Sequence, residues 1–148
     1  MNKTYTIPDG YAVYIRNTSA HFVDRIFDGS KCIETRTSPV LESCRGKWVK
    51  IVKTETHEIV GEVRFLSRKP TVFDSYESFD AKRSAHLVPK GSRFDWNGTK
   101  YGYYILATRK YEKPVPLAPD AKRYGRIAVE IDENTERRIL SENPEIYH

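Results

Sequence analysis

The chain has 148 residues, which is enough for one domain with a substantial hydrophobic core. Hydrophobic residues make up 39% and charged residues 30% of the sequence, and no apolar run approaches the roughly 20 residues that span a bilayer. Lysine and arginine number 25 against 20 aspartate and glutamate, and the formal net charge of +5 slightly favours a polyanionic partner such as RNA.

The cysteines and the first residues indicate the compartment. Cys32 and Cys44 lack the spacing of a metal site, and a secreted disulfide domain would usually carry more cysteines, so we expect reduced thiols. The segment MNKTYTIPDG contains no hydrophobic stretch of signal-peptide type. We therefore expect a cytoplasmic protein with no membrane partner.

The first predicted elements are a strand, a helix and a second strand. They cover residues 11–16, about nine residues that end at Gly29, and residues 31–36. In the second strand, alternation places Lys31 and Thr35 on one face and Glu34 and Arg36 on the other. Two basic groups and a carboxylate beside a turn are a common basis for a site. The alternative is a glycine C-cap followed by a lysine that bonds the last helical carbonyls.

Further strands and helices are expected downstream. The strands cover 48–54, 59–66, 101–109 and 124–131, and the helices cover 72–79 and a segment after an Asp132 cap. The strands at 48–54 and 59–66 form a hairpin, in which Gly61 predicts a bulge or a close approach by another group. Residues 80–100 are expected to form a long basic loop, and such loops are more often functional than idle.

The pattern of many strands with two or three short helices predicts an α+β fold that is mainly β. The ten tyrosines and six phenylalanines suit β-sheets. Neither an internal repeat nor a linker divides the chain. We expect a small mixed β-barrel that is partly open, rather than a βαβ sheet.

Several short motifs, taken in order, resemble the ASCH domain family. They are Gly29-x-Lys31-x-x-Glu34-x-Arg36, Gly46-Lys47-Trp48-x-x-Ile51, Ile59-Val60-Gly61-Glu62-Val63, His86-Leu87-Val88-Pro89-x-Gly91-Ser92, Lys100-Tyr101-Gly102-Tyr103 and Pro114-x-Pro116. No single motif is specific, but their order is. The resemblance covers about residues 11–118. It implies an ASCH domain at 1–118 and a C-terminal strand and helix extension at 119–148, packed on the same domain.

The resemblance implies a PUA-like pseudo-barrel with a cleft lined by residues 29–36, and RNA or a modified nucleoside as the ligand. Some members of the family bind RNA, some cleave it, and one branch deacetylates acetylcytidine. For that amidohydrolase branch, Lys31 matches the required lysine, but Glu34 stands where a threonine is required and no glutamate matches near residues 80–84. Alternation places Thr35 on the opposite face, so this activity is disfavoured.

As a binding site, Lys31, Glu34 and Arg36 would act together. Glu34 would accept hydrogen bonds from a base edge, and Arg36 or Lys31 would hold phosphate. Equally, Glu34 and Arg36 could simply pair with each other. Further candidates are aromatic residues that stack on bases or pack in the core, and polar groups of the basic loop that contact the RNA backbone. They are Trp48, Lys90, Ser92, Arg93, Tyr101 and Tyr103.

Whether the protein is an enzyme stays open. A binding module is favoured over a small ribonuclease, with a protein-interaction adaptor as a third hypothesis. For RNA cleavage, a base must take the 2′-hydroxyl proton and a cation must stabilise the phosphorane. The candidates are Lys31, His86, Ser92 and Tyr103. No cofactor is expected, except a divalent metal in the nuclease case. His86 is either a general base with a pKa near neutrality or a solvated loop residue.

Geometry would discriminate between these hypotheses. If Lys31, Glu34 and Arg36 share one open pocket with an aromatic wall, ligand binding is favoured. If Glu34 and Arg36 form a closed buried pair, the adaptor is favoured.

Overall fold

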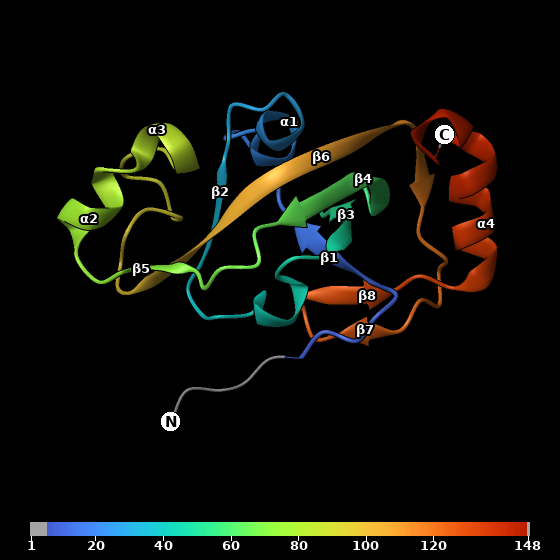
Figure 1. Cartoon of the computed structure of the whole chain (residues 1–148), viewed down its shortest axis with the longest axis horizontal. Coiled ribbons are helices and arrows are strands. Elements are labelled where there is room, and N and C mark those ends of the chain that lie inside the picture. The colour runs from blue at the N-terminus through green and yellow to red at the C-terminus, as the bar shows by residue number, and fades with distance from the viewer. Residues whose placement is uncertain (1–5, 148) are drawn as a thin grey trace.

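The computed structural model describes residues 6–147, which form a curled mixed sheet with short helices around it (Figure 1). The strands are β1 Tyr11–Ile15, β2 Ile33–Arg36, β3 Trp48–Lys53, β4 Glu58–Phe65, β5 Thr71–Phe73, β6 Lys100–Pro116, β7 Arg123–Tyr124 and β8 Ala128–Glu130. The helices are α1 Phe22–Phe27, α2 Tyr76–Asp80, α3 Arg83–His86 and α4 Glu133–Glu142, with 3-10 turns at Glu42–Cys44 and Pro144–Tyr147. The predicted α+β, mainly β pseudo-barrel is confirmed, with four short α-helices in the described residues instead of two or three.

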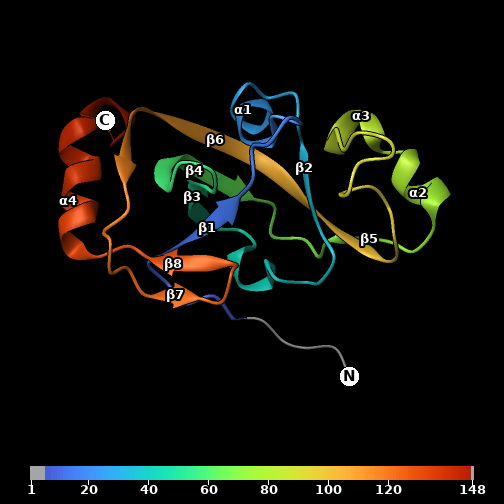
Figure 2. The same ribbon diagram turned by 180° about the vertical axis from the view of Figure 1, so that it is seen from behind.

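The sheet curls so that β1 and β2, which are not neighbours in the strand order, approach each other. The order is β2-β6-β4-β3-β1-β8-β7, and β5 pairs with β6 outside this path. β1 and β3 pair in parallel. The long strand β6, which crosses the whole view in Figure 2, pairs antiparallel with β2, β4 and β5. A side chain joins β2 to β1 across the curl, because Arg36 Nη2 donates a hydrogen bond of 2.9 Å to the carbonyl oxygen of Tyr14. We call the gap between these two strands the seam.

Two apolar clusters hold the sheet, one inside the curl and one beneath α4. In β1, Val13 and Ile15 belong to the inner cluster with the buried face of α1, whereas Ala12 and Tyr14 belong to the outer one. Both faces of β1 are therefore buried, which explains its nearly unbroken apolar sequence. In α4 only Ile139 is fully buried, and Leu140, which was also expected to pack, is 45% exposed.

Helix α1 has six residues instead of about nine. Its first residue, Phe22, follows a His21 with a positive φ of 54° and no capping side chain. The cap is supplied from farther away, since the side-chain oxygen of Asn17 accepts hydrogen bonds from the backbone N–H groups of Val23 (3.0 Å) and Asp24 (3.2 Å). Asn17 therefore satisfies the free N–H groups of the first turn from outside the helix.

Three other predictions were wrong in detail. Of the helix expected at 72–79, residues 76–79 are helical in α2, but 72 and 73 belong to strand β5, because the start of β6 extends far enough to pair with them. The single strand expected at 124–131 is two strands, β7 and β8, that turn at Gly125 with φ 56°. The expected loop at 80–100 contains helix α3. For β5, the tertiary partner decided the local structure.

The prediction for Gly61 is confirmed in both of its forms. The register between β4 and each of its neighbours shifts beside this residue, so a bulge is present. A Cβ atom there would lie 2.5 Å from the carbonyl oxygen of Arg109 and 2.6 Å from a ring carbon of Phe27. Only glycine lets α1 and β6 approach β4 this closely.

Gly61→Ala is expected to lower the free energy of unfolding by about 2–3 kcal/mol, because the nearest obstacle is backbone in the middle of the sheet. Urea denaturation followed by circular dichroism measures the loss. Gly102→Ala is the matched control, since the three atoms nearest to its Cβ, at 2.7–3.4 Å, belong to the side chains of Phe73 and Ile33, which can shift more easily than backbone, so the cost should be smaller. Equal losses in the two variants would contradict this explanation.

Candidate functional site

A pocket of about 480 Å³ lies at the seam between β1 and β2, a volume within the range of about 300–1,000 Å³ that ligand sites have. We call it the seam pocket. Its lining comes from segments far apart in the sequence: Tyr14, Ile15, Arg16, Phe22, Lys31, Glu34, Thr35, Arg36, Thr37, Thr54, His57, Val88, Phe94, Lys100, Arg123 and Arg126. Within the described residues, six of these side chains are lysine or arginine and one is a carboxylate. The pocket is therefore strongly positive.

Lys31 lines the pocket because it lies before strand β2, so the alternation of side chains along the strand does not decide its direction. The strand begins at Ile33, so the alternation predicted from residue 31 was wrong there. The backbone N–H of Lys31 donates to the carbonyl of Arg25 near the end of α1, and its ammonium donates to the carbonyl of His86 at the end of α3. Lys31 and Glu34 thus line the same cavity.

The Lys31 side chain is almost completely buried, with 2% of the residue exposed. Its ammonium lies 4.6 Å from the centre of the Phe22 ring and 3.8 Å from Oε1 of Glu34. Burial lowers the pKa of Lys31 to about 8, and the nearby Glu34 carboxylate offsets part of that shift. Lys31 is therefore still largely charged at pH 7, in a place where the charge is costly.

Glu34 and Arg36 form a close ion pair that is also part of the pocket wall. Both Nε (3.1 Å) and Nη2 (2.9 Å) of Arg36 donate to Oε2 of Glu34, and only 6% of Glu34 is exposed. A buried Glu34–Arg36 pair and a shared open pocket were expected as alternatives, but the structure has both. Oε1 of Glu34 faces Lys31 and keeps capacity for a further hydrogen bond.

The aromatic wall of the pocket is a pair of phenylalanines. Phe22 and Phe94 meet edge to face with ring centroids 5.4 Å apart, and both line the cavity. Phe94 was not among the candidates from the sequence. The sequence did contain a signal for it, because Phe94 follows the basic Arg93 and precedes Trp96 in the loop that was expected to be functional.

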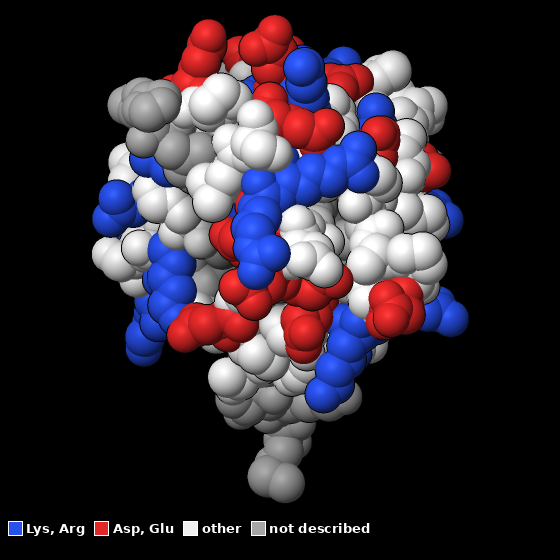
Figure 3. Space-filling model, turned by 90° about the vertical axis from the view of Figure 1, so that its right-hand side faces the viewer, with Lys and Arg blue, Asp and Glu red and all other residues white. Residues whose placement is uncertain are grey.

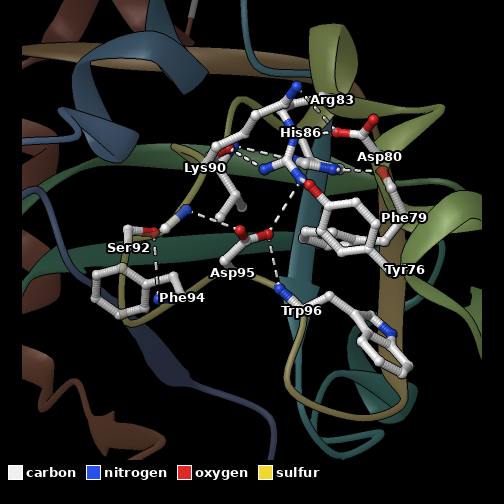
Figure 4. Close-up of polar contacts among 12 residues, drawn as sticks. Tyr76, Phe79, Asp80, Arg83, His86, Lys90, Ser92, Phe94, Asp95 and Trp96 are labelled. Carbon is white, nitrogen blue, oxygen red and sulfur yellow. Dashed lines mark hydrogen bonds and ion pairs between the residues drawn. The ribbon is translucent and has the colours of Figure 1, made fainter.

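A compact network holds the segment that carries Phe94, as Figure 4 shows. The Asp95 carboxylate accepts from the N–H groups of Gly91 and Trp96, both at 2.8 Å, and from Arg83 Nη2 at 3.1 Å. Arg83 also binds Asp80 at 2.6 Å. The basic loop expected at 80–100 is therefore a folded arm, and Arg83 is turned inward to hold it and is not free to contact RNA.

His86 is neither a general base of the pocket nor a solvated residue, so both expectations were wrong. Its ring is fully buried and stacks on Phe79 with 4.0 Å between centroids. Nδ1 accepts from the Val88 N–H at 3.0 Å, and Nε2 lies 2.8 Å from the carbonyl of Phe79, which assigns the proton to Nε2. Burial lowers the pKa of His86 to about 4. The residue holds α3 in place.

This burial gives a pH dependence of stability. An unfolded histidine protonates near pH 6.5 and folded His86 near pH 4, so between these values the unfolded state binds more protons and stability falls as the pH falls. We expect a loss of up to about 3 kcal/mol between pH 7 and pH 4 from this residue. Urea denaturation at both pH values measures it. The variant His86→Asn should lose less on acidification, and an identical loss would contradict this assignment.

The other catalytic candidates do not converge on Lys31. The Tyr103 hydroxyl donates to Glu42 at 3.0 Å inside the barrel, where burial raises the pKa of the phenol. Ser92 Oγ accepts the N–H of Phe94 at 3.3 Å and shapes the turn. Of the four catalytic candidates, only Lys31 lines the seam pocket.

The remaining predicted ligand contacts lie outside the pocket. Arg109 lies over the ring of Trp48 at 3.9 Å and occupies one face of the indole. Arg93 lies over the Phe94 ring at 4.7 Å, and Lys90 is 3.9 Å from Asp80. Tyr101 packs against the inner cluster.

The structure adds four basic residues to the pocket that sequence reasoning did not connect with it: Arg16, Lys100, Arg123 and Arg126. The last two lie in the extension after residue 118 and reach the pocket because β8 pairs with β1. Thr35 also lines the pocket, so the expectation that it faces away was wrong. The pocket lies at the edge of β2, and side chains from both faces of the strand reach it.

Three further findings concern metals, thiols and membranes. Within residues 6–147, no group of three or more histidine, cysteine, aspartate or glutamate side chains is placed to hold a metal ion. Cys32 is exposed and Cys44 is buried, neither forms a disulfide, and burial raises the pKa of the Cys44 thiol to about 11. Among the helices of the same residues, none has the length and apolar character to cross a membrane.

Comparisons with known proteins identify the fold. No family model matches the sequence, and no curated protein matches it. The structure is similar to that of ASCH from Zymomonas mobilis, with a TM-score of 0.66 and 11% identity over 88% of this chain and 93% of that one. Two mutant forms of that protein give TM-scores of 0.64 and 0.63 at 14% and 13% identity, covering 91% and 88% of this chain and 98% and 96% of theirs. The chain therefore has an ASCH-like fold, as its motifs predicted.

Proposed function

We propose that the seam pocket binds RNA or a modified nucleoside. The observation that carries the proposal is the buried Lys31–Glu34–Arg36 cluster, which opens on a pocket with an aromatic wall and several further basic side chains. A flat, polar, anionic ligand meets all three of these features. The ASCH-like fold agrees with the proposal but does not carry it.

The parts of the pocket suit different parts of a nucleotide. The free capacity of Glu34 Oε1 suits an N–H group on a base edge, and the Phe22–Phe94 wall offers apolar surface to the base. Arg123 and Arg126 are exposed at the pocket and suit phosphate, which positions a nucleic acid without reading its sequence. Ligand selectivity would then come from Glu34, and affinity from the arginines.

The test is binding of short labelled single-stranded RNA, measured by fluorescence anisotropy at several salt concentrations. We expect the affinity to fall with salt, and the double variant Arg123→Ala/Arg126→Ala to flatten the log–log slope by about 1.4, or about 0.7 for each lost phosphate contact. An unchanged slope would contradict phosphate binding by these residues.

The matched control is Arg137→Ala/Arg138→Ala, which removes the same charge from α4. These arginines already pair with Glu133 at 2.9 Å and Glu142 at 2.8 Å. Figure 3 shows this side of the molecule, where positive and negative side chains are interspersed. The control should bind RNA as the wild type does.

A hydrolase is the second candidate, and one observation favours it. Lys31, with its pKa lowered to about 8, shares the pocket with the hydroxyl groups of Thr35 and Thr37. A lysine of that kind can act as a base for a nearby hydroxyl. Within the described residues, however, the Lys31 ammonium donates to the carbonyl of His86 and to neither hydroxyl. The same RNA samples, analysed for cleavage with and without magnesium, separate the two functions: cleavage that Lys31→Ala abolishes would replace binding by hydrolysis.

A further inference from the structure

Lys100 is a buried cation of the seam pocket without a bound partner. It is the first residue of β6, only 5% of it is exposed, and it lines the cavity together with Val88 and Phe94. Within residues 6–147, its ammonium forms neither a hydrogen bond nor an ion pair. Asp95 acts on it only through space, since the Asp95 carboxylate already accepts from Gly91, Trp96 and Arg83. The ammonium itself is not fully enclosed: it keeps contact with the solvent of the cavity, where an anionic ligand can reach it.

The other charges of the pocket leave the same excess. Glu34 is already engaged by Arg36 and lies near Lys31, so it has no charge to offer elsewhere. Four lining cations remain, and none of them forms an ion pair with any described residue. They are Arg16, Lys100, Arg123 and Arg126. A small cavity with several unpaired cations favours a ligand that carries more than one negative charge.

We propose that the seam pocket recognises a phosphomonoester, at the end of an RNA chain or on a free nucleotide, and that Lys100 binds it. This inference rests on the proposed function, because the nucleoside part would occupy the Phe22–Phe94 wall. A phosphodiester inside an RNA chain carries one negative charge, whereas a phosphomonoester carries about −1.5 to −2 at pH 7 and offers three acceptor oxygens. The monoester matches the unpaired cations better.

The size of the cavity points to the same ligand. About 480 Å³ is the volume of a pocket for one small molecule, which suits a terminal nucleotide better than a stretch of chain that must enter and leave. Lys100 contributes a point charge from the buried side, and the arginines reach the phosphate from the exposed side.

The experiment compares RNA hexamers of one sequence that carry a 5′-phosphate, a 3′-phosphate or hydroxyl groups at both ends, by competition anisotropy. One phosphorylated form should bind at least about tenfold more tightly than the hydroxyl form, the lower range for one charged hydrogen bond. Lys100→Met should abolish this preference. Lys69→Met, which removes the same charge from an exposed residue outside the pocket, should keep it.

Two additional measurements keep the outcomes distinct. Thermal unfolding establishes that each variant is folded, and Lys100→Arg, which preserves the charge, should retain a preference for the phosphorylated end. Adenosine and uridine 5′-monophosphates, tested as competitors against the nucleosides, distinguish a free nucleotide from an RNA end as the source of the phosphate. Tighter binding of either phosphorylated ligand, the RNA end or the free nucleotide, than of its unphosphorylated form supports the inference.

Equal binding of phosphorylated and hydroxyl-ended RNA would overturn the inference and leave the proposed function intact. A preference that survives in Lys100→Met would also overturn it, because the phosphate would then be held elsewhere. If no RNA and no nucleotide bound at all, both the inference and the proposed function would fall.

Discussion

Glu34→Gln is expected to lower the free energy of unfolding at pH 7 by about 3–5 kcal/mol, the range for removing one partner of a buried ion pair. The substitution keeps the shape of the side chain but leaves two cations, Lys31 and Arg36, facing each other without a carboxylate. Lys31 has nowhere to go, since 2% of it is exposed and its ammonium is held by the carbonyl of His86. Chemical denaturation measures the loss.

The control for this prediction is Glu136→Gln, which removes a carboxylate from a partly exposed ion pair with Lys50 at 3.1 Å. Surface pairs of this kind contribute about 0–1 kcal/mol, so the control should be nearly as stable as the wild type. If both variants lose the same small amount, Glu34 does not hold the cluster together.

Lys31→Met is expected to weaken RNA binding by about 100-fold, which corresponds to the loss of a charged hydrogen bond. Its stability at pH 7 should stay equal to that of the wild type or rise by about 1–2 kcal/mol, because the pKa of about 8 means that the fold disfavours the charged form. Methionine also suits the contact with Phe22. A substitution that weakens RNA binding without lowering the stability of the fold indicates that the residue is present for function.

The pH dependence of stability tests whether the fold disfavours the charged form of Lys31. Between pH 8 and the unfolded pKa of 10.5, the unfolded chain binds more protons than the folded one, so Lys31 makes the wild type more stable as the pH rises. Lys31→Met lacks this contribution. Lys69→Met serves as the control of equal charge. A Lys31→Met variant that binds RNA normally, or that is much less stable at pH 7, would assign the lysine a structural role.

The elements whose local pattern agrees with their tertiary setting were predicted from the sequence. The β3–β4 hairpin, the glycine within it and the Asp132 cap of α4 follow from period-two alternation, from a missing side chain and from a short polar residue. Residues 71–73 could not be predicted in this way. They are a strand only because β6 extends to Lys100, about 30 positions away along the chain, and supplies the partner.

The candidate site was predicted only where one segment carries it. Lys31, Glu34 and Arg36 lie close in sequence and meet in the pocket. Phe22 and Arg126 reach it from helix α1 and the turn between β7 and β8, and no local pattern connects segments that distant. His86 failed for a different reason: a lone histidine in a mostly polar stretch suggests exposure, yet its direct neighbours Ala85 and Leu87 are apolar and its ring fills the space against Phe79.

The most direct test of the central claim, that the seam pocket is the ligand site, is amide chemical-shift mapping of the labelled protein with single-stranded RNA. We expect the largest shifts at residues 31–37, 94–100 and 123–127, which surround the pocket. Shifts centred on α4, with the pocket amides unchanged, would contradict the claim.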